Sequence, residues 1–412
     1  MKKIPTISLF VLASSALLFS SAISVLSVLF SVAGCIYLLH NQRFQSIRLQ
    51  QFSIEIPFLA SLIALSVSLI LSNLYHEEKW GTYHFPIAVI LSLPAFFIFC
   101  RLNFEIIALW TGAAVGSILA FIIAIYEIKF LGAERAGYMI NNPILFGSIA
   151  MCLSGFSIIG YREKVSGFVW QNALLLCGSV AGFLAAVLSG SKSCLLTVPI
   201  IFYLWRKKTA HKFSRGGNAW FALLIFLVLM FFLIKSNSYL ILRFTEAYHG
   251  AASWAQSGKI TEGSIGPRLE LLKFGIEMGQ INPWIGIGRN GMLEMLSKAS
   301  SDFKYDIFIT QLHTMHNEFL NIFVTNGLLG LVGLLAVYFF GLKYFYTIRR
   351  FENEDLHSIH LAGLSLFSMY LIFGLSEVAL QLNSFRNFFL IFTVCFIGSA
   401  HRLRHCVIRK NN

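Results

Sequence analysis

Charged residues are scarce in this sequence. Asp, Glu, Lys and Arg make up 12% of its 412 residues, whereas hydrophobic residues make up 57% and the mean hydropathy is +0.71. A soluble globular domain carries about 25% charged residues, because charge is needed to cover its surface. The composition therefore excludes a soluble globule and indicates an integral membrane protein.

Ionisable residues are also missing from the middle of the apolar runs. The glutamates closest to these runs all fall near predicted span ends, at Glu55, Glu105, Glu318 and Glu377. Ionisable side chains inside the membrane are the usual mark of ion-coupled transport. Their absence argues against a transporter and leaves a flippase or permease as the last alternative.

The seven cysteines form no recognisable pattern. They lie almost entirely in apolar runs, and none falls in the polar stretch 235–311. Their spacing is neither that of a disulfide framework nor that of a metal site.

The apolar runs predict an all-α polytopic fold of about twelve transmembrane helices. A span requires about 20 apolar residues, so the run 7–39 is predicted to be a tight hairpin of two spans. The other ten spans cover 53–74, 85–100, 105–126, 141–160, 168–189, 193–205, 219–234, 317–342, 359–379 and 387–400. The run 317–342 is long, and we expect it to tilt or break at Gly327 and Gly330. No repeat or linker divides residues 1–412, which we interpret as one membrane domain.

Lys and Arg are distributed as the positive-inside rule predicts for cytoplasmic termini. The short loops and tails on that side contain 19 Lys and Arg, whereas the short loops on the other side contain five. Long segments are exempt from the rule. The large segment 235–316, between spans nine and ten, is therefore predicted on the non-cytoplasmic side.

This large segment is nearly neutral. Residues 235–311 contain eight Lys and Arg against seven Asp and Glu. The net charge of +13 therefore gives no basic surface for nucleic acid, and any anion would be recognised by particular placed side chains. We expect the chemistry of the protein here and where the chain returns to the membrane.

Arg268 is the first candidate side chain. Residues 264–278 are predicted to form a helix, with a serine cap and a proline in the first turn. At about 100° per residue, Arg268 points away from the solvated stripe and lies beside the apolar face. The predicted solvated stripe consists of Glu270, Lys273 and Glu277. A guanidinium so placed needs an anionic partner; the alternatives are an arginine that snorkels to water or pairs with a structural carboxylate.

The loop 283–291 contains Gly286, Gly288 and Gly291 in G-x-G-x-x-G spacing. A dinucleotide site requires a preceding strand and a βαβ unit, and neither is predicted here. We interpret the loop as a tight turn between two short helices. Arg289 lies in it and is a candidate substrate-binding residue.

His313 and His316 stand three residues apart where the polar segment re-enters the membrane, and Asn317 follows. This is not the zinc arrangement of two histidines four residues apart, and two histidines without a third ligand make a poor metal site. We therefore expect no metal and no other cofactor. A neutral histidine here can accept a proton from a hydroxyl; the alternative is a hydrogen-bonded interfacial histidine.

The sequence 189–193, Ser-Gly-Ser-Lys-Ser, interrupts the apolar runs on the same side of the membrane. Glycine and small hydroxyl residues such as Ser191 allow a phosphate to approach Lys192 closely. The alternative is a lysine that anchors the span at the interface. With the phosphate interpretation, Lys192, Arg268 and His316 share one membrane face.

These motifs together resemble the O-antigen ligase and polymerase superfamily of bacterial membrane glycosyltransferases. The resembling parts are the motif 189–193, Arg268 ahead of Asn-Pro-Trp-Ile-Gly-Ile-Gly at 282–288, and His-Asn-Glu-Phe-Leu at 316–320 followed by Asn-Gly-Leu-Leu-Gly at 326–330. The resemblance extends from span seven to span ten. The superfamily usually has arginine where this chain has Lys192, and lysine binds phosphate without arginine's bidentate fork.

The resemblance implies a GT-C-like fold and transfer of a glycan from an undecaprenyl-diphosphate donor at the periplasmic face of the inner membrane. Lys192 and Arg268 would hold the diphosphate, and His316 would be the general base, without a metal. The remaining candidates would bind substrate: Ser191, Arg289, His313 and Asn317. His313 is also a second candidate for the base.

The predicted reaction is that of an O-antigen ligase, with lipid A-core oligosaccharide as the acceptor. The modest length and the single large periplasmic segment favour this reading. An O-antigen polymerase would instead use a second lipid-linked repeat unit, and a protein O-oligosaccharyltransferase would use a serine of a protein.

Overall fold

The structure is a computed structural model that describes residues 3–17, 21–40, 52–139, 142–162, 169–209, 238–257, 265–299, 305, 307–351 and 353–411. These residues form helices and connecting loops, which confirms a polytopic helical membrane protein. The amino-terminal helices are α1 (Lys3–Ser14), α2 (Ala22–His40), α3 (Ile56–Tyr75), η3 (Trp80–Tyr83), α4 (His84–Arg101), α5 (Ile107–Lys129), α6 (Pro143–Ile159), α7 (Val169–Leu188), α8 (Lys192–Leu195) and α9 (Val198–Thr209). The others are α11 (Ser238–Ser257), α12 (Ile265–Gly279), α13 (Gly288–Lys298), η4 (Ile307–Gln311), α14 (Glu318–Ile348), α15 (Glu354–Gly374) and α16 (Asn383–Asn411).

Seven stretches of the described chain are long and apolar enough to cross a membrane. They are Ala22–His40, Ile56–Tyr75, Trp80–Arg101, Ile107–Lys129, Val169–Leu188, Glu318–Ile348 and Glu354–Gly374. Pro5–Ser14 and Pro143–Ile159 are shorter apolar helices. The run 7–39 forms two helices, α1 and α2, as predicted, but the tight hairpin was wrong because α1 packs against α5 and α2 packs against α4. The predicted span 219–234 lies outside the described residues.

The predicted span 193–205 was wrong as a single helix. The structure divides it into α8, of four residues, and α9, which begins at Val198. Pro199 explains the division, because proline lacks the amide hydrogen that would continue α8 and is favoured in the first turn of a new helix.

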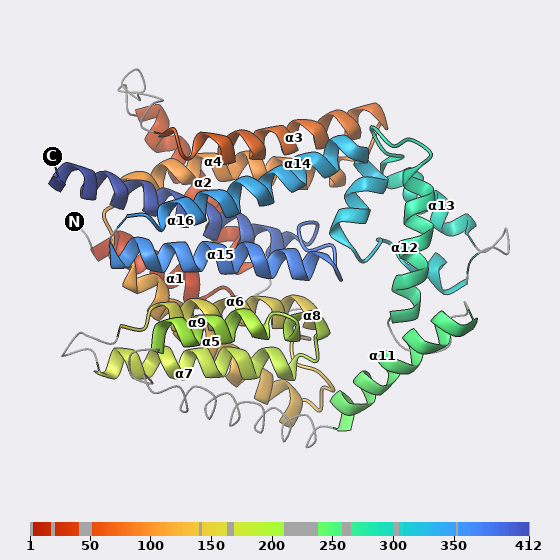
Figure 1. Ribbon diagram of the computed structural model, residues 1–412, viewed down its shortest axis with the longest axis horizontal. Helices are drawn as coiled ribbons and strands as arrows, with labels where there is room; N and C mark the ends of the chain where they lie inside the picture. Colours follow the sequence, from red (N-terminus) through yellow and green to blue (C-terminus); the bar gives the residue numbers. More distant parts are fainter. Residues whose placement is uncertain are drawn as a thin grey trace.

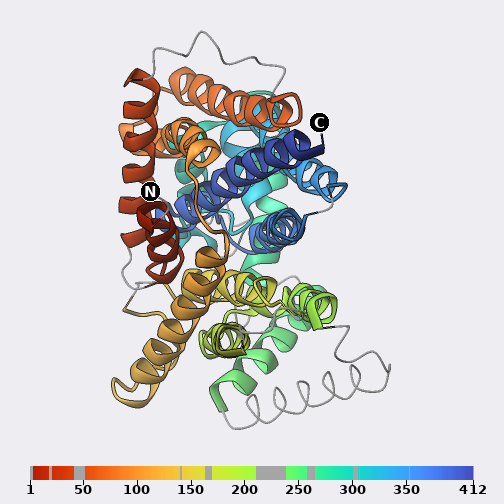
Figure 2. The same ribbon diagram turned by 90° about the vertical axis from the view of Figure 1, so that its left-hand side faces the viewer.

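The helices pack side by side, and both chain termini lie at one end of the bundle (Figures 1 and 2). We call this the inner end, because contacts there join the stretches predicted to be cytoplasmic. Arg402 Nη1 donates to Asn103 Oδ1 at 3.0 Å, and Lys208 Nζ donates to Ser358 Oγ at 3.2 Å. A further contact between the guanidinium of Arg162 and the carboxylate of Asp355 supports the predicted grouping of loops.

The opposite end, which we call the outer end, carries α11, α12 and α13 (Figure 1). These helices belong to the segment predicted as water-facing. Helix α12 packs against α11, α14 and η4. Because it is covered on several sides, Glu270 is only 6% exposed, and its predicted place in a solvated stripe was wrong.

The long helix α14 is broken where the sequence predicted. Gly327 has φ 66° and ψ −165°, which is not helical, whereas no such break occurs at Gly330. The loop after α12 fills the gap: Ile287 N donates to Val324 O at 2.9 Å and Leu328 N donates to Pro283 O at 2.7 Å. The freed backbone groups of α14 are thus satisfied inside the protein, as a membrane protein requires.

The same loop confirms the predicted turn between short helices. It joins α12 to α13, with Gly286 and Gly288 at φ 81° and 73°. A Cβ on Gly286 would lie 2.4 Å from the backbone carbon of Thr325. Glycine is needed because the loop and α14 approach backbone to backbone, which fixes α12 against the start of α14.

Candidate active site

The turn after α7 builds one wall of the site. Gly190 has φ 61°, a left-handed conformation that glycine adopts readily. Ser191 N donates to Ser189 Oγ at 3.2 Å, and the hydroxyls of Ser191 and Ser193 are 3.1 Å apart. These contacts hold Lys192 at the outer end, directly after the turn.

A small cavity brings Lys192 together with two arginines. Its lining includes Arg135, Ser191, Lys192, Arg268 and Ser376. We call it the cation pocket. Its three cationic residues come from the α5–α6 loop, from α8 and from α12, so only the folded chain assembles them.

Arg135 also fixes the wall to which it belongs. Its Nε donates to Ser189 O at 2.8 Å, and Ala136 N donates to Leu188 O at 3.0 Å. The α5–α6 loop is therefore tied to the carboxyl end of α7. This contact orients Arg135 toward the same turn that carries Lys192.

His316 stands just before α14 in an unusual backbone conformation. Its φ is 47°, one of two positive values among the described non-glycine residues. Such a conformation is uncommon in a non-glycine residue and occurs at functional sites. Asn317 follows as the helix cap: its Oδ1 accepts from Leu320 N at 3.0 Å, and its Nδ2 donates to Leu375 O at 3.2 Å.

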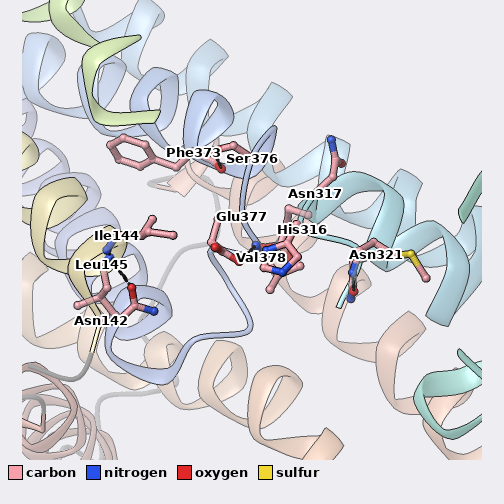
Figure 3. Close-up of polar contacts among 12 residues, drawn as sticks. Asn142, Ile144, Leu145, His316, Asn317, Asn321, Phe373, Ser376, Glu377 and Val378 are labelled. Atoms are coloured by element: carbon pink, nitrogen blue, oxygen red, sulfur yellow. Dashed lines mark hydrogen bonds and ion pairs between the residues drawn. The ribbon is translucent and has the colours of Figure 1, made fainter. Parts of the chain in front are cut away.

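Glu377 is the partner of His316. It lies in the loop between α15 and α16, and its Oε1 is 3.3 Å from His316 Nδ1. Figure 3 shows the two side chains pointing toward one another. Because the carboxylate faces Nδ1, the other ring nitrogen, Nε2, is the one available to a substrate.

Electrostatics link this pair to the cation pocket. Burial acts to raise the pKa of Glu377, but the contact and charge of His316, the backbone amide of Val378 and the charge of Arg268 outweigh it. The pKa of Glu377 is therefore below its ordinary value, and its carboxylate is ionised at neutral pH. The neighbouring Ser376 lines the cation pocket itself.

The structure thus gathers part of the predicted site. Ser191, Lys192 and Arg268 line one cavity, and His316 adjoins it through Glu377. Asn317 uses both ends of its side-chain amide to cap and tether α14, and its predicted contact with substrate stays a prediction.

Two predicted residues lie elsewhere. Arg289 lines a second cavity at the outer end, away from the cation pocket. His313 is exposed and lines neither cavity. Their predicted contacts with substrate also stay predictions.

Sequence reasoning missed Arg135, Ser376 and Glu377. The sequence shows Arg135 only as a loop charge on the sparsely charged side, where an arginine is itself a usable signal. It shows Glu377 only as a carboxylate near a predicted span end. Its pairing with His316 joins residues far apart in sequence, which no local pattern indicates.

A metal centre was not expected. In the part of the chain that the structure describes, no group of three His, Cys, Asp or Glu side chains is placed to hold a metal ion. Metal-independent catalysis stays a prediction.

The fold and the site define the class of the protein: a polytopic helical membrane protein with a cationic pocket and a histidine–carboxylate pair at one end of the bundle. Residues 177–335 match the protein family described as O-Antigen ligase. The matched residues contain Lys192, Arg268 and His316.

One relative covers nearly the whole chain. A Haemophilus influenzae protein, described as "Uncharacterized protein", is 20% identical over 384 residues, which are 90% of this chain and 92% of the relative. This likeness includes regions outside the family match and assigns no function. Arg135 and Glu377 lie outside residues 177–335, so their part in the site rests on the structure.

Proposed function

We propose that this chain is an O-antigen ligase of the inner membrane of a Gram-negative bacterium. It transfers O-antigen polysaccharide from undecaprenyl diphosphate to lipid A-core oligosaccharide at the periplasmic face, with both termini in the cytoplasm. The family match supports lipid-linked polysaccharide as the substrate class. The observation that carries the proposal is the cation pocket beside the His316–Glu377 pair.

The cation pocket holds the donor diphosphate. Lys192, Arg268 and Arg135 supply positive charge from three elements, and cations are the natural partners of phosphate oxygens. Their positions are fixed before substrate binds, so they stabilise the charge that develops on the diphosphate as it leaves. The nearby hydroxyls of Ser191 and Ser376 donate further hydrogen bonds.

His316 activates the acceptor. Its Nε2 accepts the proton of an acceptor sugar hydroxyl, and the hydroxyl oxygen attacks the anomeric carbon of the donor. A new glycosidic bond forms as the bond between that carbon and the diphosphate oxygen breaks. Glu377 orients the imidazole and stabilises its protonated form, and undecaprenyl diphosphate departs with the electron pair.

Reconstitution tests this function. Purified protein is mixed with lipid-linked O-antigen and lipid A-core, and the glycosylated product is followed on gels. We expect product from the wild type, with or without a chelator, and none from His316→Ala or Arg268→Ala. Lys298→Ala removes an exposed cation of α13 and is the matched control, which should remain active. Wild-type activity in His316→Ala and Arg268→Ala would reject the site.

A ligase and a polymerase use different acceptors, so the phenotype of a deletion strain distinguishes them. A strain that lacks a ligase accumulates lipid-linked polymer, whereas a strain that lacks a polymerase carries one repeat unit on its core. Loss of a flippase would instead leave lipid-linked units on the cytoplasmic side. We expect the first of these three patterns when the gene for this chain is deleted.

A further inference from the structure

A second polar cavity at the outer end is not used in the mechanism above. Its lining contains four side-chain amides and two arginines: Asn73, Asn326, Gln381, Asn383, Arg289 and Arg386. Among the described residues that line it, none is Asp or Glu. A cavity with two positive charges and several amides is suited to an anion that also carries hydroxyl groups.

Among the residues that line this cavity, Arg386 is buried and its hydrogen-bonding groups are only partly satisfied. It is only 4% exposed, and its Nη2 donates to Asn383 Oδ1 at 2.7 Å while its Nη1 reaches Leu380 O at 3.4 Å. Its Nε has no hydrogen-bond partner. A buried guanidinium is costly without an anion and acceptors for its five N–H groups.

No carboxylate in the described part of the chain lies within ion-pair distance of Arg386. The charge of Glu318 acts on Arg386 from beyond that distance, and the ring centroid of Phe85 lies 5.8 Å from Arg386 Cζ. Glu318 Oε2 instead accepts from Leu380 N at 2.7 Å. Arg386 therefore presents an incompletely satisfied positive charge to the cavity.

A lateral groove meets the second cavity at Arg386. It runs between α2, α4 and α16, and it shares His84, Asn383 and Arg386 with the cavity. The rest of its lining is mainly small hydroxyl and aliphatic side chains, among them Ser27, Ala88, Leu390 and Ile391. Polar groups stand at its outer end and apolar groups follow along the helices.

Exposed aliphatic side chains border this groove. On α2 these include Val25 and Val28, which are 54% and 53% exposed, and on α4 they include Leu91, which is 44% exposed. In a membrane-spanning bundle, such residues face lipid. The groove is therefore accessible from the bilayer, whereas Arg386 lies where a headgroup would be.

We propose that the Arg386 cavity binds the phosphate-bearing headgroup of a membrane lipid, and that the hydrocarbon chains of this lipid lie in the groove between α2 and α4. The phosphate accepts from the guanidinium of Arg386 and from that of Arg289, and the amides bind hydroxyl groups of the headgroup.

The loop between α15 and α16 joins the two cavities. Ser376 lines the cation pocket, Glu377 contacts His316, and Gln381 lines the Arg386 cavity. The proposed base thus stands between two anion-binding cavities. If the proposed transferase function holds, the lipid bound at Arg386 is the acceptor, and the lipid diphosphate of the donor occupies the other cavity.

Direct binding tests the site without any assay of transfer. The probe is a fluorescent phosphatidic acid, which carries a phosphate monoester on two acyl chains, and its anisotropy is measured with purified protein in uncharged detergent. Unlabelled phosphatidic acid, diacylglycerol and glycerol 3-phosphate serve as competitors. We expect competition by phosphatidic acid, none by diacylglycerol, and competition by glycerol 3-phosphate only at concentrations at least about tenfold higher.

Variants assign the binding to this cavity. Arg386→Gln should weaken binding at least about tenfold, because a charge-assisted hydrogen bond is lost, and Arg386→Lys should weaken it less. Arg289→Gln should also weaken it and leaves the buried residue intact, so the site stays testable where Arg386→Gln fails to fold. Lys298→Gln, on the same helix as Arg289, is the matched control. Lys192→Gln, in the cation pocket, should still bind phosphatidic acid.

Several outcomes reject the proposal. Equal affinity of the wild type, Arg386→Gln and Arg289→Gln would show that phosphatidic acid binds elsewhere, and loss of binding in Lys192→Gln would place it in the cation pocket. Equal competition by glycerol 3-phosphate would identify a site for free phosphate compounds rather than for a lipid.

A kinetic measurement tests separately whether the lipid bound at Arg386 is the acceptor. In the reconstituted reaction, Arg386→Gln should raise KM for lipid A-core at least about tenfold and leave KM for the donor within twofold. If Arg386→Gln weakens lipid binding but leaves KM for lipid A-core unchanged, the cavity binds a lipid that is not the acceptor. A reconstituted chain with no transferase activity would reject the proposed function and leave the binding result standing.

Discussion

At the scale of single residues, the site depends on His316, whose positive φ of 47° is uncommon in a residue other than glycine. The asparagine cap that follows is bonded both to α14 and to the α15–α16 loop. That tether brings Glu377 to Nδ1 of His316. The strained backbone is thus held by contacts on both sides, and the ring is oriented before substrate arrives.

Glu377→Gln removes the charge that faces the imidazole. We expect kcat to fall by about 10- to 100-fold with little change in KM, because a positioning partner is lost while the base remains. Glu377→Asp should recover part of the loss, and Glu294→Gln, on an exposed carboxylate, should have no effect. Steady-state kinetics of the reconstituted enzyme measure this.

The carboxylate of Glu377 should stay ionised across the neutral range. The pKa of this carboxyl lies below its ordinary value of 4.5, so the wild-type group is charged at pH 5 as well as at pH 8. The infrared carboxylate band that Glu377→Gln removes should therefore keep its intensity between these two pH values. Loss of this band at pH 5 would show that Glu377 is protonated there.

Arg135 provides a second test at this scale. Arg135→Lys keeps the charge but loses the hydrogen bond from Nε to Ser189 O, so we expect a smaller loss than in Arg135→Gln. Removal of the charge should raise KM for the donor at least about tenfold. Lys129→Gln, an exposed residue before the same loop, should behave as the wild type in the same assay.

At the scale of the helical elements, the break in α14 brings together the proposed donor-binding and base motifs. A Cβ at Gly327 would lie 2.3 Å from the backbone carbon of Trp284, and the residue has φ 66°. Only glycine accepts both the conformation and the contact. The loop before α13 and the start of α14 are thereby locked into one unit.

Gly327→Ala should lower the free energy of unfolding by about 2 kcal/mol or more. Gly291→Ala is a suitable control, because its nearest neighbour would be Ile287 Cβ at an ordinary 3.4 Å and alanine favours a helix. Thermal unfolding of the purified variants, followed by intrinsic fluorescence, compares the two. Equal stability would contradict the locked loop.

The inner end contains a buried charge cluster between α3 and α16. Glu55 Oε1 lies 3.2 Å from both Arg404 Nη2 and His401 Nδ1, and Glu55 and Arg404 are 0% and 4% exposed. Burial acts to raise the pKa of Glu55, but His401 and Arg404 outweigh it and hold the pKa below 4.5. The folded state therefore favours the ionised carboxylate.

Glu55→Gln should destabilise the protein by about 3 kcal/mol, because Arg404 is left buried without its partner. Because the pKa of Glu55 is lower in the folded than in the unfolded chain, the ionised carboxylate stabilises the fold at pH values above the unfolded-state pKa. This stabilisation is lost as the pH falls through the folded-state pKa. The difference in melting temperature from the wild type should thus persist at pH 5 and shrink below 4.5. Glu105→Gln, at the same end but exposed, should change little.

At the scale of the whole molecule, the predicted orientation places the outer end in the periplasm. Lys298 is exposed on α13 at the outer end, and Cys406 is exposed near the carboxyl terminus at the inner end. A membrane-impermeant maleimide should label Lys298→Cys in intact spheroplasts, in a background where Cys35, Cys177 and Cys406 are serine. In the wild type, Cys406 should react only after permeabilisation. The reverse pattern would invert the topology.

Much of the bundle follows from the sequence alone. Apolar runs of span length, separated by short basic loops, allow few arrangements because the bilayer requires each backbone group to be bonded within a helix. The division of 7–39 into two helices, the turn after α12 and the break at Gly327 were all predicted from such local features, whereas the packing of α1 and α2 on different neighbours was not. Each is decided by chain composition and glycine or proline chemistry within a few residues.

The sequence by itself determined that this is a polytopic membrane protein, and it predicted that Lys192, Arg268 and His316 share one membrane face. Tertiary structure alone decided that Arg135 completes the cation pocket, that Glu377 faces His316 and that Arg386 lies buried beside a second cavity. The physical reason is that span length and charge asymmetry are local properties of the chain. A pocket is made by side chains from distant helices, and only their packing brings them within bonding distance.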